Sequence, residues 1–195
     1  MTFISSVISE CFSTKHIKLS ACAVLGAAAL SGCATSQPLP TLGNEQHVAV
    51  HAVTAQGVGA QIGTISLRDS AAGLIISTSL SQLPAGPHGF HIHENASCKP
   101  AEKDGKMGAA LAAGGHYNPN QAPNHGTPLT GHLGDLPLLN VEADGTARVT
   151  AIAPRLTLAD VQNRAIMIHA GSDNYSDSPK ALGGGGDRIA CGVIQ

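Results

Sequence analysis

The sequence is poor in aromatic residues and in charge. Its 195 residues include no Trp, and Phe and Tyr make up 3% of them. Lys and Arg together number 11 against 13 Asp and Glu, which gives a formal net charge of -2. A nucleic-acid-binding protein needs a positive field to neutralise phosphates. This charge balance, with no basic run, therefore argues against DNA or RNA as a partner.

A long apolar run is also missing from the N-terminal region. Residues 19–30 form an apolar run of twelve residues, fewer than the roughly 20 that a membrane-spanning helix needs. Lys15 and Lys18 precede this run. A basic start followed by a short apolar run predicts a secretory signal over residues 1–32.

The end of this predicted signal carries a lipidation pattern. Leu-Ser-Gly-Cys at 30–33 resembles the bacterial lipobox, which implies that Cys33 receives a diacylglycerol and becomes the N-terminus after cleavage. Residues 33–46 would then be a flexible tether between this lipid and the rest of the chain. The protein would lie in the bacterial cell envelope or periplasm, anchored to a membrane by the lipid on Cys33. An ordinary signal peptide with Cys33 as a spare thiol is the alternative.

Cysteine is scarce beyond the predicted signal. Removal of residues 1–32 takes away two of the five cysteines. If Cys33 carries lipid, Cys98 and Cys191 remain in a chain that is sent to an oxidising compartment, where we expect them to form a disulfide. Two buried free thiols are the alternative.

Turn residues and short strand-like segments indicate an all-β protein. The chain has 23 Gly and 11 Pro, and its length suits one domain, which we place at 47–195. Alternating or β-branched segments predict seven strands, at 47–54, 61–68, 73–80, 88–94, 146–152, 165–169 and 188–194. An eighth is expected within 133–141, and 156–164 is expected to contain a short helical turn. Residues 95–135 and 170–187 are predicted to be long functional loops.

Histidine is the residue in excess, with ten in the chain. On the strand expected at 88–94, alternation sends His91 and His93 to one face and Phe90 and Ile92 to the core. Such a pair alone is weak evidence of a metal site. However, five more residues that ligate metals follow in glycine-rich surroundings, and together these seven are more than one metal needs: His116, His125, His132, Asp135 and His169.

Five motifs identify a family that the chain resembles. They are Gly-Phe-His-Ile-His-Glu at 89–94, Gly-Gly-His-Tyr-Asn-Pro at 114–119, Gly-His-Leu-Gly-Asp-Leu-Pro at 131–137, His-Ala-Gly-Ser-Asp-Asn-Tyr-Ser-Asp at 169–177 and Leu-Gly-Gly-Gly-Gly-Asp-Arg-Ile-Ala-Cys-Gly-Val-Ile at 182–194. These motifs resemble those of the copper/zinc superoxide dismutases, in particular their bacterial periplasmic branch. The segment 125–132 departs from the family by being shorter and by lacking its usual charged residue.

The resemblance implies a fold and a set of metal ligands. The fold would be an eight-stranded antiparallel Greek-key barrel, an immunoglobulin-like sandwich. Each subunit would bind one copper ion and one zinc ion. The implied copper ligands are His91, His93, His116 and His169, and the implied zinc ligands are His116, His125, His132 and Asp135.

The resemblance also implies an activity, the dismutation of superoxide to dioxygen and hydrogen peroxide, which would protect the cell envelope. His116, the shared ligand, would supply a proton, and Arg188 would bind and orient the superoxide anion beside copper. Asp173 would link His91 to His125 outside the metal ligands. Four lysines could add a local positive field: Lys99, Lys103, Lys106 and Lys180.

Several points stay open on the sequence alone. A non-catalytic envelope protein that binds copper or zinc is the main alternative, although such a protein would be expected to lack a copper histidine or the arginine. A zinc hydrolase would need an open zinc position, which Asp135 closes. His47 and His51 could form an extra metal or haem site or be surface residues, and His88 is expected to be structural. Monomer and homodimer are both compatible with the sequence.

Overall fold

The computed structural model describes residues 44–195. The predicted signal at 1–32, Cys33 and most of the predicted tether lie outside the described residues. Within 44–195, no helix is long and apolar enough to cross a membrane.

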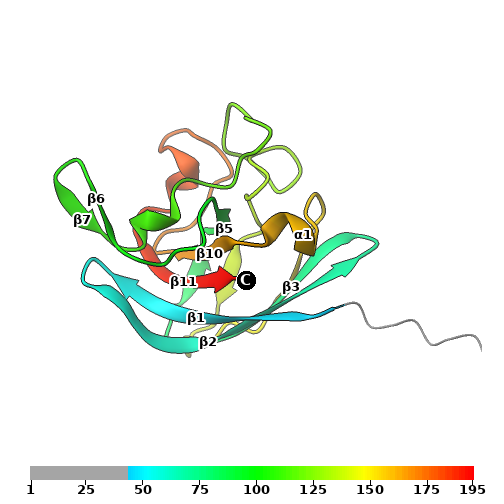
Figure 1. The fold of residues 1–195 in the computed structure, drawn as a ribbon, viewed down its shortest axis with the longest axis horizontal. Helices are drawn as coiled ribbons and strands as arrows, with labels where there is room; N and C mark the ends of the chain where they lie inside the picture. The colour runs from blue at the N-terminus through cyan, green and yellow to red at the C-terminus, as the bar shows by residue number, and fades with distance from the viewer. Residues whose placement is uncertain (1–43) are drawn as a thin grey trace, which may run out of the picture. The chain divides into compact units, whose positions relative to one another are not determined.

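The domain is built from antiparallel strands. Seven of them form one sheet in the order β5-β10-β11-β1-β2-β3-β9. The sheet is strongly curved, so that one of its faces lies on the inside (Figure 1). Two further strands, β4 and β8, pair with each other, and β4 continues through Gly89 into β5. The strand bounds are β1 Gln46–Thr54, β2 Gly57–Ser70, β3 Gly73–Leu80, β4 Gly86–His88, β5 Phe90–His93, β8 Leu139–Val141, β9 Thr150–Ala153, β10 Arg164–His169 and β11 Arg188–Ile194. This architecture agrees with the predicted all-β Greek-key class.

Alternation along the strands explains the core. In β3, residues Leu74, Ile76 and Leu80 are buried while their neighbours are less so, because successive side chains of a strand point to opposite faces. Phe90 and Ile92 of β5 join the same buried cluster. The core therefore lies inside the curled sheet, and the other face of β5 is free for the histidines.

Most predicted strands are present, with shifted ends. The strands expected at 73–80 and 188–194 match β3 and β11, and the eighth is the short β8. The single strand expected at 88–94 is divided into β4 and β5 at Gly89. The strand expected at 146–152 is β9, which starts only at Thr150, because Ala147 forms just an isolated bridge with Leu80.

The loop predicted at 95–135 contains more structure than expected. It holds a hairpin of β6 Ala101–Lys103 and β7 Lys106–Gly108, followed by the 3-10 turn η1 Leu111–Ala113. Asp104 and Gly105 both have positive φ, as a two-residue hairpin turn of type I′ requires. An Asp-Gly pair is a known signal for this turn, and it was available in the sequence.

A disulfide and a capped helical turn stabilise parts of the chain between the strands. The disulfide between Cys98 and Cys191 joins the first long loop to β11, which confirms the expected pairing. The predicted helical turn is α1 Leu158–Val161, which begins with a capping box between Thr157 and Asp160. The second long loop, 170–187, contains only the 3-10 turn η2 Leu182–Gly184.

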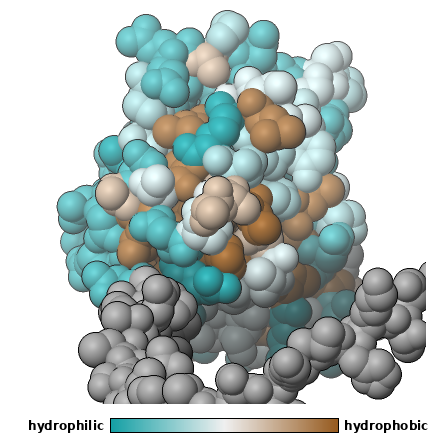
Figure 2. Space-filling view, turned by 90° about the vertical axis from the view of Figure 1, so that its right-hand side faces the viewer, coloured by the Kyte–Doolittle hydropathy of each residue, from teal (hydrophilic) through white to brown (hydrophobic). Residues whose placement is uncertain are grey.

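The surface is mixed in character. On the side of the described residues that Figure 2 draws, apolar side chains form separate spots among polar ones. Scattered apolar residues of this kind are normal for a protein surface.

Candidate metal centre

Strand β5 carries two of the histidines and lies next to the segments that carry the others. His91 and His93 are both buried, at 0% and 1% exposure. One edge of β5 pairs with β10, which ends at His169. On its other side, isolated bridges join His91 to Asp135 and His93 to His116. The backbone thus brings residues from β5, β10 and the first long loop to one place.

The structure gathers four of the predicted ligands into one group. One ring nitrogen from each of His91, His93, His116 and His169 lies within 4.8 Å of the others, and all four residues are buried. These four are the residues that the resemblance assigns to copper. Several imidazoles converging in this way suit copper or zinc.

A second group overlaps the first. Ligand atoms of His91, His116, His125 and Asp135 also lie within 4.8 Å of one another. His132, which the resemblance places here, lies beside this group, with its Nδ1 3.5 Å from Asp135 Oδ1. His91 and His116 both belong to the two groups, as a ligand shared between two ions would.

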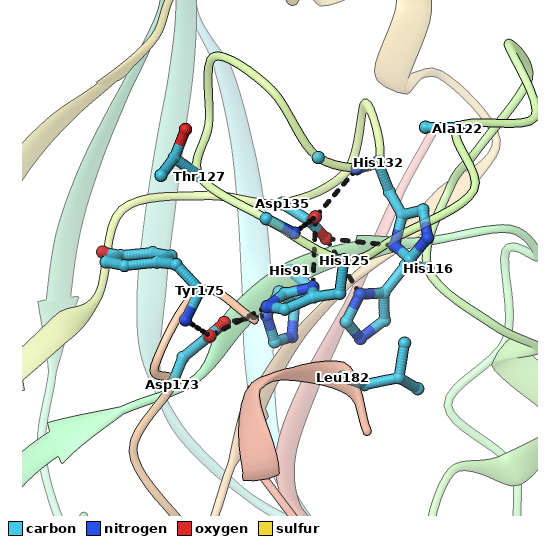
Figure 3. Close-up of polar contacts among 12 residues, drawn as sticks. His91, His116, Ala122, His125, Thr127, His132, Asp135, Asp173, Tyr175 and Leu182 are labelled. Carbon is cyan, nitrogen blue, oxygen red and sulfur yellow. Dashed lines mark hydrogen bonds and ion pairs between the residues drawn. The ribbon is translucent and has the colours of Figure 1, made fainter. Parts of the chain in front are cut away.

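Asp135 organises the second group. Its Oδ1 is 2.9 Å from His116 Nδ1, and its Oδ2 accepts hydrogen bonds from the backbone N–H groups of Gly126 and His132 at 3.0 and 2.8 Å. Although burial raises the pKa of Asp135, the hydrogen bonds from His116 and His125 outweigh it and hold the pKa far below its ordinary value. Asp135 is therefore an anion in the middle of the histidines (Figure 3).

Asp173 links the two groups from outside. Its Oδ2 is 2.7 Å from His91 Nε2, and its Oδ1 is 2.8 Å from His125 Nε2. The Tyr175 N–H also donates to Oδ1, at 2.7 Å. A Cβ on Gly183 would lie 2.0 Å from Asp173 Oδ1, so this glycine is needed for the carboxylate to reach both rings. The link from His91 to His125 is the one predicted.

The histidines of the first group are neutral in the metal-free protein. Burial lowers the pKa of His91 to about 3 and that of His169 to about 4, and it holds the pKa of His93 well below the usual range. Burial also lowers the pKa of His116. Neutral imidazole is the form that binds a metal ion.

The site contains polar atoms that a cation would satisfy. Nδ1 of His91 and of His132 is buried without a hydrogen-bond partner, and Nδ1 of His125 lies 3.1 Å from Asp135 Oδ2. An unpaired buried polar atom costs about 1–3 kcal/mol. The other ring nitrogens of His91 and His125 are already held by Asp173. The free Nδ1 atoms next to the Asp135 carboxylate therefore fit bound metal ions.

Arg188 shares a cavity with three of these histidines. A cavity of about 250 Å³ is lined by Arg188, His93, His116, His169 and Leu182, among others. The Arg188 guanidinium donates from Nη1 to the carbonyl of Ala110 and from Nη2 to that of Gly114, both at 2.6 Å. Both carbonyls belong to the loop that the disulfide attaches to β11.

The three unassigned histidines do not extend the centre. His88 is buried, with its ring nitrogens 2.7 Å from the His169 carbonyl and 2.8 Å from the Pro84 carbonyl, so the structural interpretation is confirmed. His47 is exposed and His51 half-buried. Within residues 44–195, neither belongs to a group that could hold a metal. The four lysines of the predicted positive field are exposed, and their effect stays a prediction.

Two residues that support the centre were not singled out from the sequence, although Asp177 ends the motif at 169–177. Asp177 accepts hydrogen bonds from the N–H groups of His125 and Leu182, both at 2.9 Å, and so joins the two long loops. Arg155 donates to three carbonyls of the segment that leads to His132. Both residues act over long sequence separations, which a local pattern does not reveal.

Comparisons with known proteins agree with this geometry. Residues 61–194 match the family model described as copper/zinc superoxide dismutase. Superoxide dismutase [Cu-Zn] of Escherichia coli K12 is 51% identical over 152 residues, which cover 77% of this chain and 88% of the relative. The Cu/Zn superoxide dismutase structure from Brucella abortus has a TM-score of 0.76 at 47% identity, covering 78% of this chain and 100% of that one. The monomeric copper, zinc enzyme of Salmonella enterica has a TM-score of 0.70 at 52% identity, with 78% and 100% covered.

Proposed function

The chain belongs to the copper/zinc superoxide dismutase family, and from this membership we propose how its own residues carry out the reaction. The protein is a superoxide dismutase that uses copper and zinc. Two superoxide anions and two protons become dioxygen and hydrogen peroxide. When bound, copper supplies the one-electron redox chemistry and zinc a fixed positive charge.

The free ring nitrogens support our assignment of the two metal groups. We assign copper to His91, His93, His116 and His169, and zinc to His116, His125, His132 and Asp135. His91 has only one free ring nitrogen, because Asp173 holds Nε2, so His91 cannot serve both ions. The unpaired Nδ1 of His132 near Asp135 supports His132 as the residue that completes the zinc set. Three histidines and one carboxylate suit a closed zinc site.

Arg188 binds the substrate in this proposal. Two carbonyls hold its guanidinium at the cavity wall, and its remaining N–H donors can bind and orient a small anion. Burial lowers the pKa of Arg188, but a guanidinium remains charged at physiological pH. The cavity that Arg188 shares with His93, His116 and His169 is the observation that carries the proposed function.

His116 moves a proton in this proposal. Its Nδ1 lies 2.9 Å from Oδ1 of Asp135, itself a proposed zinc ligand, so Nδ1 would serve zinc, and Nε2 is the atom that can take a proton and pass it to the second superoxide. Because burial lowers the pKa of His116, this proton is released readily. An imidazole suits such a transfer near neutral pH.

A dismutase assay on protein loaded with copper and zinc tests the function. We expect fast superoxide decay that disappears when the metals are removed and returns when both are restored. A His169→Ala variant should bind less copper and lose activity. If fully loaded wild-type protein bound both metals without accelerating superoxide decay, the alternative of a non-catalytic metal-binding protein would replace this one.

We also propose that the protein acts in the bacterial cell envelope, held by a lipid on Cys33. The lipobox-like sequence at 30–33 and the similarity to bacterial enzymes support this location. Growth with a labelled fatty acid tests the anchor. Wild-type protein should carry the label and sediment with membranes, and Cys33→Ser should do neither. Equal labelling of the two proteins would refute the anchor.

A further inference from the structure

The zinc half of the centre is held by a residue from another part of the fold. Arg155 lies between β9 and α1, outside both long loops. Its Nε donates to the Pro128 carbonyl at 2.6 Å, and its Nη2 donates to the carbonyls of Gly131 and His132 at 3.0 and 2.7 Å. One half-buried guanidinium therefore holds three backbone carbonyls within five consecutive residues.

The segment that Arg155 contacts has no charge of its own. Residues 126–131 read Gly-Thr-Pro-Leu-Thr-Gly. They fold into a tight turn in which the N–H groups of Thr130 and Gly131 both donate to the Thr127 carbonyl. The carbonyls at the end of such a turn lack partners within it, and an arginine can satisfy them. Arg155 supplies the donors that the segment cannot.

These contacts act directly on a zinc ligand. The His132 N–H donates to Asp135 at 2.8 Å, while the His132 carbonyl accepts from Arg155 at 2.7 Å. The backbone of His132 is thus held on both sides. Gly126 and Gly131 close the base of the turn, where a Cβ on Gly131 would lie 2.2 Å from Asp135 Oδ2. Small movements of this turn would move the His132 ring away from Asp135.

Arg155 itself is rigidly placed. The next residue, Leu156, is buried in the core at 1% exposure, and its N–H donates to the Ala153 carbonyl of β9. Thr157 then begins α1 through its capping box. The guanidinium is therefore a fixed point against which the turn is held.

We propose that Arg155 is a positioning residue for zinc: it holds the turn at 128–132 so that His132 completes the zinc site. The inference rests on the proposed zinc ligands. Residues that orient metal ligands typically change metal affinity by about 10- to 100-fold when removed. We expect a loss of this size in zinc affinity for Arg155→Ala, with copper affinity changed by less than about threefold.

The test is zinc competition with a chromophoric chelator, on copper-free wild-type, Arg155→Ala and Arg155→Lys proteins. Arg148→Ala is the matched control, since it removes the same charge from an exposed site just before β9. Arg155→Lys keeps the charge but lacks the fork of donors, so its loss should be intermediate. If Arg155→Ala does not fold, Arg155→Lys decides by the same criterion.

Two further measurements separate positioning from general stability. Amide hydrogen exchange at His132 should speed up in Arg155→Ala but not in Arg148→Ala. A merely structural role would lower the unfolding free energies of metal-free and zinc-loaded protein equally and leave zinc affinity unchanged, which would overturn the inference. Wild-type protein that bound no zinc would instead overturn the zinc assignment itself.

Discussion

At the scale of single residues, two aspartates divide the work of holding the imidazoles. Asp135 contacts the histidines on the zinc side, and Asp173 joins His91 to His125 from outside. Each carboxylate also accepts backbone N–H groups, which fixes its own position. The ligand rings are therefore oriented before any metal arrives, and this reduces the ordering cost of binding.

Arg188 is the residue whose removal should affect catalysis without affecting the metals. Arg188→Ala removes the guanidinium from the cavity, and electrostatic guidance of this kind raises the rates of charged substrates by about 10- to 1,000-fold. We expect kcat/KM for superoxide to fall by about 10- to 100-fold, with copper and zinc contents unchanged. Pulse radiolysis with metal analysis checks this. Arg188→Lys should retain more activity, and undiminished activity in Arg188→Ala would remove this residue from the mechanism.

His125 predicts how zinc binding depends on pH. In the metal-free protein burial lowers its pKa, but hydrogen bonds to Asp135 and Asp173 outweigh this and raise the pKa to about 9. His125 is therefore protonated at pH 7, and zinc must displace that proton. The zinc dissociation constant should fall about tenfold per pH unit between pH 7 and pH 9.

Chelator competition at pH 7, 8 and 9 measures this slope. The linkage also applies to the metal-free fold. Because the folded pKa is raised, the charged His125 stabilises that fold fully below pH 6.5, and this contribution is lost as the pH rises through about 9. His91 and His169, with pKa values of about 3 and 4, are neutral from pH 7 to pH 9 and add no pH dependence of stability in that range. Zinc affinity that was constant across this range would contradict the prediction.

At the scale of elements, the centre depends on how two loops are attached to a sheet edge. Strand β5 fixes two histidines, and isolated bridges align the first loop along it. Asp177 then joins the first loop to the second through the N–H groups of His125 and Leu182. The disulfide provides the covalent attachment to β11.

The disulfide should matter for both stability and turnover. The two cysteines are 93 residues apart, and closing a loop of that length stabilises a fold by about 4–5 kcal/mol in the chain-entropy model. The carbonyls that hold Arg188 belong to the attached loop. In a Cys98→Ser, Cys191→Ser variant, we expect the unfolding free energy to fall by about this amount and activity to fall more than metal content.

Denaturant unfolding and metal analysis of the same preparations check this prediction. Wild-type protein kept oxidised is the reference. A variant that unfolded at the wild-type denaturant concentration and kept full activity per copper would show that the loop is held in place without the bridge.

At the scale of the whole molecule, the fold and the metal centre occupy separate regions. The main apolar cluster lies inside the curled sheet and includes Phe90 and Ile92, whereas His91 and His93 point to the other side of β5. We therefore expect the β-sheet to form without the metals, and the metals to add to its stability.

Removal of both metals should lower the melting temperature and leave the sheet intact. Zinc at 1,000 times its dissociation constant adds about 4 kcal/mol, which corresponds to a shift of about 10 °C for a domain of this size. Circular dichroism before and after chelation should show a retained β spectrum and this lower melting temperature. Loss of the β spectrum at 25 °C would show that the fold requires the metals.

Much of this molecule could be predicted from its sequence because the signals are local. Alternation placed His91 and His93 opposite Phe90 and Ile92, and β3 and β11 were predicted with the ends that the structure has. The hairpin β6–β7 was missed although Asp104-Gly105 is a turn signal. The prediction of one continuous strand at 88–94 was wrong, because the chain changes its pairing partner at Gly89, from β8 to β10.

The sequence by itself determined the all-β class, the family and the residue types that bind metal, because these depend on periodicity and on short motifs. The resemblance and the cysteine count also implied Asp173 and the disulfide, but only the tertiary structure decided what else holds those residues in place. Arg155 reaches His132 across 23 residues, and Asp177 reaches His125 across 52. Such contacts form only when distant parts of the chain fold together, so the residues next to them in the sequence do not predict them. The rigidity of the centre depends on these contacts.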